Sequence, residues 1–194
     1  MMIVNELRNS KTYNSLLEKA KNCTQNNPHH IYDVGKHIEK VAEAAENMIP
    51  SDHVLIVAAM LHDIGKPDVK SEKDGKDIFF KHAERSAEIA ADLLKIIKDE
   101  NINKDDYTSI LWLVKHHEIS NILSEKTLKK YIREVGDINV SRLFILRYCD
   151  INGQSDFQKE SKLSILKENI QSFINIMTEI EMEVSYREIL CTIL

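Results

Sequence analysis

The sequence predicts an all-α fold built as a single domain. Only five glycines and three prolines occur in 194 residues, and such a scarcity of turn-forming residues favours long helices over many short strands. Apolar residues recur at spacings of three and four along most of the chain, which is the period of an amphipathic helix. One run, Val54–Leu61, is apolar without interruption and predicts a helix buried on all sides. A chain of this length can bury a substantial core, so we expect one domain over residues 1–194.

Charge and cysteine usage limit the partners and the environment. The net charge of −5 argues against non-specific binding along a nucleic-acid backbone. A local basic pocket for one phosphate or for an RNA 3′ end is compatible with that charge, although the charge favours small substrates. The three cysteines lie far apart without a Cys-x-x-Cys pair, so neither a disulfide framework nor a thiolate zinc site is predicted. The N-terminus lacks the pattern of a signal peptide and no apolar run approaches roughly 20 residues, so we expect a cytoplasmic protein that does not enter a membrane.

The first fifty residues predict two helices separated by a loop. Residues 5–23 form one amphipathic surface pattern, and the polar stretch 26–32 is interrupted by a proline. Asp33 is suited to cap the helix that starts at Val34. His37 lies one helical turn later, at the border of the apolar face. It is either a satisfied core histidine or a ligand that needs partners from elsewhere.

The buried helix ends in chemically active residues. The pair Ser51-Asp52 supplies an N-cap before it, and His62-Asp63 follows it directly. Imidazole and carboxylate are the groups that hold divalent metals. Gly65 is suited to a left-handed residue that closes a helix, and Lys66 adds a positive charge in the same turn. A capped helix end without metal is the alternative for this stretch alone.

A charged loop is predicted over residues 68–77, above the end of that buried helix, where loops often control access. The next helix opens near Phe79 and continues to about Ile97. Its first turn contains His82, which is either a surface histidine or a further ligand.

Two adjacent histidines, His116 and His117, end the helix that starts at Asp105 after a polar break at 101–104. Neighbouring helical residues diverge by about 100°, so both can reach one centre only if the helix ends beside it.

The last third of the chain predicts four more helical segments. A short helix around Leu128 closes at Gly136, and a buried helix over 140–148 ends in Asp150. A long amphipathic helix follows over 161–182, and residues 183–194 are expected to form a short last one.

Seven side chains at helix ends or on inward faces are candidate metal ligands. Two carboxylates with several imidazoles and no thiolate suit Mn, Fe, Co or Ni better than Mg, which prefers more oxygen, or structural Zn, which prefers a closed tetrahedral set. We therefore expect a catalytic centre with one or two divalent transition-metal ions. The candidates are His37, His62, Asp63, His82, His116, His117 and Asp150.

A histidine, an adjacent His-Asp pair and a distal aspartate, here His37, His62-Asp63 and Asp150, resemble the signature of the HD-domain superfamily of metal-dependent phosphohydrolases. The resemblance covers about residues 28–154 and leaves the helices over 155–194 outside the motif core. It implies a helical HD-domain bundle.

Three stretches, 32–37, 58–67 and 81–87, resemble more closely the HD domain of bacterial CCA-adding tRNA nucleotidyltransferases. Lys81 and Ala83 depart from the Gly-His-Glu that is usual there. The chain has no counterpart of the nucleotidyltransferase head, so CCA addition is not expected.

The resemblance implies roles for individual residues. His82 and the His116-His117 pair match positions that hold a second ion in two-metal members, with Asp63 as the bridging ligand, and a mononuclear site is the alternative. Asp63 and Lys66 would be catalytic, with Lys66 neutralising the substrate phosphate. Arg85 is a second candidate for that phosphate, or else a salt-bridged surface residue.

The implied activity is hydrolysis of nucleotide phosphoesters, with 2′,3′-cyclic phosphodiesters or nucleoside monophosphates preferred. Nucleotide di- or triphosphates and dinucleotides are alternative substrates within the superfamily. A non-catalytic metal-bound module that binds tRNA ends or a partner protein is the alternative of another class. The acidic charge and the intact ligand set weigh against it.

Overall fold

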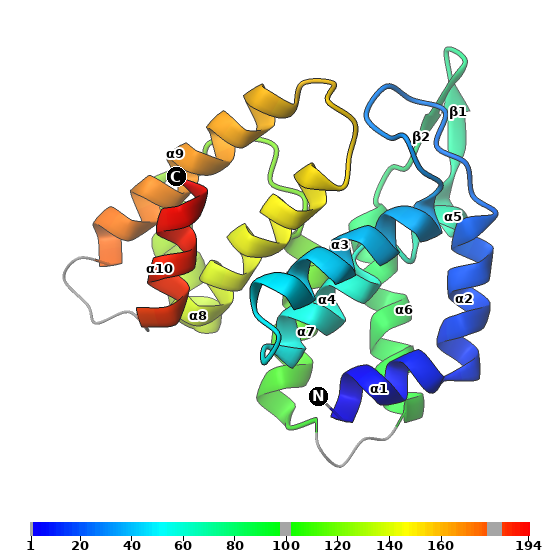
Figure 1. Ribbon diagram of the computed structural model, residues 1–194, viewed down its shortest axis with the longest axis horizontal. Helices are drawn as coiled ribbons and strands as arrows, with labels where there is room; N and C mark the ends of the chain where they lie inside the picture. The colour runs from blue at the N-terminus through cyan, green and yellow to red at the C-terminus, as the bar shows by residue number, and fades with distance from the viewer. Residues whose placement is uncertain (1, 98–101, 178–183) are drawn as a thin grey trace.

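The computed structural model describes residues 2–97, 102–177 and 184–194, and it confirms the predicted all-α fold (Figure 1). Helices account for almost all the regular structure in these ranges, together with one short β-hairpin. The elements in chain order are α1 (Met2–Asn9), α2 (Lys11–Lys21), α3 (Val34–Met48), α4 (His53–Leu61), α5 (Lys66–Val69), β1 (Ser71–Lys73), β2 (Lys76–Ile78), α6 (His82–Ile97), α7 (Lys104–His116), α8 (Glu125–Asn152), α9 (Lys159–Met177) and α10 (Val184–Ile193).

The single N-terminal helix expected over residues 5–23 is two helices in the structure. Ser10 leaves the helical region, with φ −69° and ψ 123°, and its hydroxyl accepts the amide of Tyr13. A side chain that caps a new helix also ends the old one, because serine offers the backbone an alternative hydrogen bond. The chain therefore turns between α1 and α2, as Figure 1 shows.

Helix α4 forms the centre of the core, as its uninterrupted apolar run predicts. Every residue of Val54–Leu61 is buried, and α4 packs against α1, α3, α6, α7 and α8. Both predicted N-caps of this region are confirmed. The Asp33 carboxylate accepts the amide of Lys36 at the start of α3, and the Asp52 carboxylate accepts the amide of Leu55 at the start of α4.

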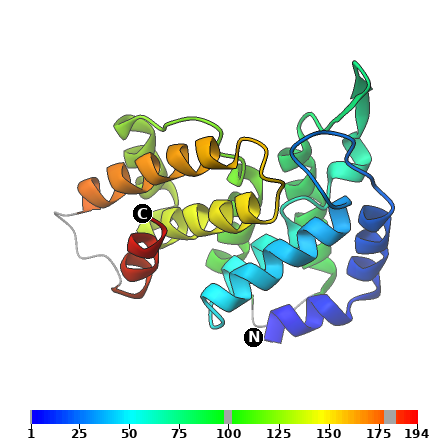
Figure 2. The same cartoon turned by 45° about the horizontal axis from the view of Figure 1, so that its top comes forward.

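The charged stretch 68–77 is not a plain loop, which corrects the prediction. Strands β1 and β2 pair antiparallel, and the turn between them places Asp74 at φ 53° and Gly75 at φ 71°. Two central residues with positive φ form the turn that matches the twist of a two-stranded hairpin. The hairpin projects beyond the helices in both views (Figures 1 and 2), and the Asp77 carboxylate ties it to the backbone amide of Asn26 at 2.6 Å.

The C-terminal helices stack on α8. Gly136 has φ 82°, which bends α8 at the position where the sequence predicts one helix to close and another to follow. Helix α9 lies alongside α8 (Figure 2), and α10 packs against both. Residues 178–183, where the long and the last predicted helices would meet, lie outside the described residues, so the expected boundary at 182–183 does too. Among the described helices, none has the length and apolar character needed to cross a bilayer.

Candidate metal centre

The ends of five helices bring buried histidines and aspartates to one point. His62 caps the end of α4 and Asp63 follows it, His82 is the first residue of α6, and His117 caps the end of α7. His37 lies in the first turn of α3, and Asp150 lies in the last turn of α8. All of these side chains are buried, and long-range packing of the helices rather than local sequence brings them together.

The Asp63 carboxylate lies at the centre of two ligand triangles. Its Oδ2 is 3.5 Å from His37 Nε2 and 3.4 Å from His62 Nε2, and those two nitrogens are 3.3 Å apart. Its Oδ1 is 3.4 Å from His82 Nε2 and 3.5 Å from His117 Nε2, and those two nitrogens are 3.4 Å apart. Each oxygen thus completes one set of three ligand atoms, and Asp63 belongs to both sets.

Hydrogen bonds fix which nitrogen of each imidazole faces Asp63. In all four rings Nδ1 contacts a backbone carbonyl, which can only accept, so Nδ1 carries the hydrogen and Nε2 of the neutral ring carries a lone pair. Burial lowers the pKa of His82, which keeps that ring neutral. The carbonyl partners are Gly153 for His37, Ala59 for His62, Phe79 for His82 and Val114 for His117, at 2.8 to 3.2 Å.

This donor set fits a divalent cation in each triangle. Two facing lone pairs 3.3 or 3.4 Å apart repel each other, and a cation between them turns that repulsion into ligation. Two ligands about 2.0 to 2.1 Å from one ion lie about 2.9 to 3.4 Å apart at octahedral or tetrahedral angles, close to the edges of these triangles. In addition, the buried Oδ1 of Asp63 has no hydrogen-bond partner among the described residues. A buried carboxylate oxygen without a partner is costly unless a cation is bound to it.

Asp63 is held as a carboxylate by its surroundings. Burial alone would raise its pKa, but the Lys66 ammonium and the adjacent imidazoles outweigh burial and hold the pKa of Asp63 well below its usual value. Lys66 Nζ lies 2.7 Å from Asp63 Oδ2 and donates to Gln25 Oε1 at 3.0 Å. Lys66 is itself buried, so its charge is directed at this site rather than at solvent.

Asp150 extends the first triangle. Its Oδ1 lies 3.0 Å from His37 Nε2, and the guanidinium of Arg147 donates to its Oδ2 at 2.5 Å. Burial raises the pKa of Asp150, but the charge of Arg147 beside it brings the pKa well below the usual value. Asp150 is therefore ionised beside His37 and available as a fourth ligand.

The structure does not bring two of the predicted residues into this centre. His116 stacks on Trp112 with ring centroids 4.4 Å apart, and it donates from Nδ1 to the Trp112 carbonyl. Only His117, one residue further at the helix end, turns towards Asp63. Arg85 pairs with Asp68 at 2.7 Å and with Glu88 at 2.9 Å, the surface arrangement that was the alternative to a phosphate contact.

The prediction that Gly65, after α4, adopts a left-handed conformation is wrong. Gly65 has φ −86° and ψ −10°, a conformation open to other residues. A Cβ on Gly65 would lie 2.5 Å from the backbone nitrogen of Ser86 and 2.8 Å from the carbonyl carbon of Arg85. Glycine is thus needed for the close approach of α6, which carries His82, and the Gly65 amide donates to the Ser86 hydroxyl at 2.9 Å.

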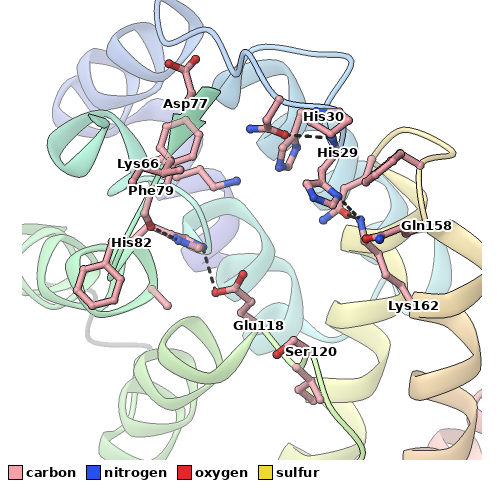
Figure 3. Close-up of a pocket in the computed structure, with 18 of the residues that line it drawn as sticks. His29, His30, Lys66, Asp77, Phe79, His82, Glu118, Ser120, Gln158 and Lys162 are labelled. Atoms are coloured by element: carbon pink, nitrogen blue, oxygen red, sulfur yellow. Dashed lines mark hydrogen bonds and ion pairs between the residues drawn. The ribbon is translucent and has the colours of Figure 1, made fainter. Parts of the chain in front are cut away.

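A cavity of about 1040 Å³ opens over the centre, and both Lys66 and His82 line it. Figure 3 shows Lys66 reaching into it from one wall and residues of α9 facing it from the other. Sequence reasoning did not assign several lining residues, including His30 and Glu118. The Nδ1 of His30 is buried without a hydrogen-bond partner among the described residues, and burial lowers the pKa of His30 to about 3. Only its place within the predicted loop over residues 26–32 could have indicated His30.

A helical bundle with histidines and aspartates gathered at its helix ends is typical of metal-binding proteins, and here these residues form a candidate metal site. The sequence profile of the HD domain matches residues 29–151, so the chain belongs to the HD domain family. This family places it in the superfamily of metal-dependent phosphohydrolases and confirms the resemblance at that level.

Among curated proteins, the chain is similar to bifunctional uridylyltransferase/uridylyl-removing enzymes of Burkholderia mallei and Burkholderia pseudomallei. Both are 25% identical to it over 157 residues, which cover 68% of this chain and 17% of the relative. The chain therefore spans about one sixth of the length of these relatives. No solved structure matches the chain significantly.

Proposed function

We propose that the chain hydrolyses phosphate esters of nucleotides with two divalent ions bound on either side of Asp63. His37, His62, Asp63 and Asp150 would hold one ion, and Asp63, His82 and His117 the other. The observation that carries this proposal is the shared carboxylate: Asp63 completes both triangles, and its Oδ1 is buried without a hydrogen-bond partner in the described part of the chain. Two ions held close together would stabilise both the attacking and the leaving oxygen of a phosphoryl transfer.

Divalent ions held by these residues would supply a hydroxide at neutral pH and positive charge for the oxygens of the phosphoryl group. The protein contributes the remaining positive charge through Lys66, which lines the cavity and whose ammonium lies against Asp63. Lys66 would donate to a non-bridging phosphate oxygen, where a point charge stabilises the charge that develops on phosphoryl transfer. His30, neutral and without a partner for Nδ1 among the described residues, offers the substrate one further hydrogen bond.

The donor set favours Mn, Fe, Co or Ni over Mg. Two imidazoles with one or two carboxylates form each set, and imidazole suits first-row transition metals better than Mg, which prefers oxygen ligands. In each of the four histidines around Asp63, Nδ1 contacts a backbone carbonyl and so orients the ring, as in established metal sites.

Several observations support a nucleotide substrate. The name of the relatives includes removal of a uridylyl group, a nucleotide joined through phosphate. The cavity is large enough for a nucleotide, and the phenylalanines Phe80 and Phe157 line it with 75% and 45% of their surface exposed. Exposed aromatic rings beside a phosphate site are suited to stack on a base.

We retain 2′,3′-cyclic phosphodiesters and nucleoside monophosphates as the preferred substrates, on the closer resemblance to the HD domain of CCA-adding enzymes. We also propose that residues 1–194 work as one unit, with small molecules rather than long RNA as substrates. Helix α9, outside the motif core, contributes Ser161, Lys162 and Ile165 to the cavity wall, which supports that unit.

The test is turnover of a nucleotide panel by untagged protein purified without chelator. The panel contains nucleoside 2′,3′-cyclic phosphates, monophosphates, triphosphates and dinucleotides, each assayed as purified, after metal removal, and after addition of Mn, Fe, Co, Ni or Mg. We expect hydrolysis of at least one class that chelation abolishes and a transition metal restores. Absence of turnover with every metal, together with no bound transition metal by elemental analysis, would overturn the proposal.

A further inference from the structure

A second cationic position lies across the cavity from the metal centre. Lys162 lies in the first turn of α9 and lines the cavity, on the wall opposite Lys66 in Figure 3. Its ammonium donates to Gln154 Oε1 at 2.6 Å and contacts His29 Nδ1 at 3.3 Å. An ammonium has three N–H donors, so one remains for a molecule in the cavity.

Lys162, which is half-buried, differs in its partners from the buried cations of the cavity. Lys66 is paired with Asp63, and Arg147 is paired with Asp150. The two side chains that contact the ammonium of Lys162 are both neutral acceptors, and no carboxylate among the described residues lies within ion-pair distance of it. No ion pair among the described residues therefore neutralises its positive charge.

The surroundings of Lys162 favour an anion. Burial and the nearby charge of Arg147 lower the pKa of Lys162, so its charged form is destabilised until a negative group approaches. His29 also lines the cavity. Since the Lys162 ammonium donates to Nδ1 of His29, the ring hydrogen of neutral His29 lies on Nε2.

His29 is also held in place by its contacts with the loop before α9. The Ser155 amide donates to the His29 carbonyl at 2.9 Å, and the Ser155 hydroxyl donates to the Pro28 carbonyl at 2.5 Å. The His29 ring packs edge-on against Phe157 with centroids 4.9 Å apart. Donors held in place by such contacts lose little entropy when a ligand binds.

We propose that Lys162, with His29, binds a second phosphate of the substrate, so that the preferred substrates carry a phosphate besides the one that is cleaved. This inference rests on the proposed function. The substrate class is a nucleotide phosphorylated at both ends of its ribose, such as a nucleoside 3′,5′-bisphosphate or a 5′-phosphorylated nucleoside 2′,3′-cyclic phosphate. The cavity of about 1040 Å³ provides room for such a molecule between Lys66 and Lys162.

A competing role for Lys162 is purely structural. Gln154 donates from Nε2 to Asp150 Oδ1 at 2.9 Å while its Oε1 accepts from Lys162. Lys162 could thus act only by orienting Gln154 and, through it, the ligand Asp150. In that case its removal would weaken metal binding and affect all substrates equally.

The first experiment compares kcat/KM for paired substrates that differ only in the second phosphate, adenosine 2′,3′-cyclic phosphate with and without a 5′-phosphate. Wild type should prefer the 5′-phosphorylated member about tenfold, the worth of one charge-assisted hydrogen bond. Lys162→Met should abolish the preference through KM while leaving turnover of the unphosphorylated member within about twofold. Lys162→Arg should restore part of the preference.

Lys159→Met is the matched control, because Lys159 begins the same helix, pairs with the exposed Asp156 and does not line the cavity. It should keep the preference of wild type. A wild type without preference, or a Lys162→Met variant that loses metal and both activities together, would overturn the inference.

A second experiment does not depend on turnover. Calorimetric titration of metal-stripped protein with adenosine 3′,5′-bisphosphate and with adenosine 3′-monophosphate should show about tenfold tighter binding of the bisphosphate, and Lys162→Met should remove the difference. If no substrate is hydrolysed but this difference is present, the proposed hydrolysis fails while the second phosphate site stands. Equal affinities of wild type for the two nucleotides would reject the site.

Discussion

His82 and His117, 35 positions apart in the chain, present their Nε2 atoms to each other at 3.4 Å, and both nitrogens lie within 3.5 Å of Asp63 Oδ1. Each ring is oriented from behind by a backbone carbonyl three residues earlier, Phe79 for His82 and Val114 for His117. The same i−3 contact orients His62 through Ala59. At the start of α6 and at the ends of α4 and α7, the same contact with a backbone carbonyl three residues earlier thus orients an imidazole towards the Asp63 carboxylate.

The paired histidines of α7 give the first prediction. His117→Ala should reduce the metal content of purified protein from two ions to one and reduce turnover by orders of magnitude, because one ion cannot stabilise both the attacking and the leaving oxygen. Elemental analysis and steady-state kinetics measure the two effects. His82→Ala should behave in the same way.

His116→Ala is the matched control. It removes the stack on Trp112 and should lower the free energy of unfolding by about 1 kcal/mol, with metal content and rate unchanged. The two-metal hypothesis would be rejected if wild type held a single ion and His82→Ala turned over substrate at the wild-type rate.

The bridging carboxylate gives the second prediction. Asp63→Asn keeps the shape of the side chain but removes the charge shared by both triangles, so we expect both ions to be lost and turnover to fall to background. The far-ultraviolet circular dichroism should stay close to that of wild type, because Asp63 follows α4 rather than lying within it. Retained turnover in a folded Asp63→Asn protein would contradict the assignment of the site.

The third prediction concerns the junction of α10 with α4. The Tyr186 hydroxyl donates to Asp52 Oδ2 at 2.5 Å, and Arg142 donates to the same carboxylate at 2.8 Å. Burial and the hydrogen bond to Asp52 raise the pKa of Tyr186 above its usual value of about 10. A group with a raised pKa in the folded state contributes stability that is complete below its unfolded pKa and is lost as the pH rises through the folded one.

Tyr186→Phe should therefore lower the free energy of unfolding by about 1.5 kcal/mol at neutral pH, and the difference from wild type should shrink above about pH 10. Urea denaturation at pH 7, 9 and 11 measures it. Tyr32→Phe, at an exposed position of the loop before α3, controls for the loss of a hydroxyl and should have little effect. If the difference in the free energy of unfolding between wild type and Tyr186→Phe grew with pH instead, the raised pKa of Tyr186 would be contradicted.

Much of the fold follows from local patterns in the sequence, because helix caps and apolar periodicity act over a few residues. Asp33 and Asp52 cap the helices as predicted, and Gly136 interrupts α8 where expected. The break at Ser10 and the hairpin turn at Asp74-Gly75 were missed, since each depends on a single short side-chain or backbone preference inside an otherwise helical or charged pattern.

The residue types of the candidate site can be chosen from the sequence, but their geometry cannot. Adjacent helical positions point about 100° apart, so the choice between His116 and His117 depends on where α7 ends relative to Asp63. Arg85 and Lys162 illustrate the same limit. The local sequence does not indicate that Arg85 pairs with Asp68 or that Lys162 faces the cavity. Residues far away in the chain decide both arrangements.

The last prediction tests whether close packing of α6 positions the proposed second ion. A Cβ at Gly65 would lie 2.5 Å from the backbone nitrogen of Ser86, and the backbone of a helix cannot yield as a flexible side chain can. Gly65→Ala should therefore push α6 away, lower the free energy of unfolding by about 1 to 3 kcal/mol, and displace His82 at the start of that helix. We expect weaker binding of the second ion, measured by competition with a chelator, while the ion at His37 and His62 is retained.

Gly75→Ala separates this effect from a general glycine effect. Gly75 has φ 71° but no atom within 4 Å of its would-be Cβ, so alanine there strains the exposed hairpin turn by about 1 kcal/mol without moving α6. Metal content and turnover should stay at wild-type levels in Gly75→Ala. If Gly65→Ala instead kept both ions with unchanged affinity while losing stability, the packing of α6 against Gly65 would serve the fold alone and not the placement of His82.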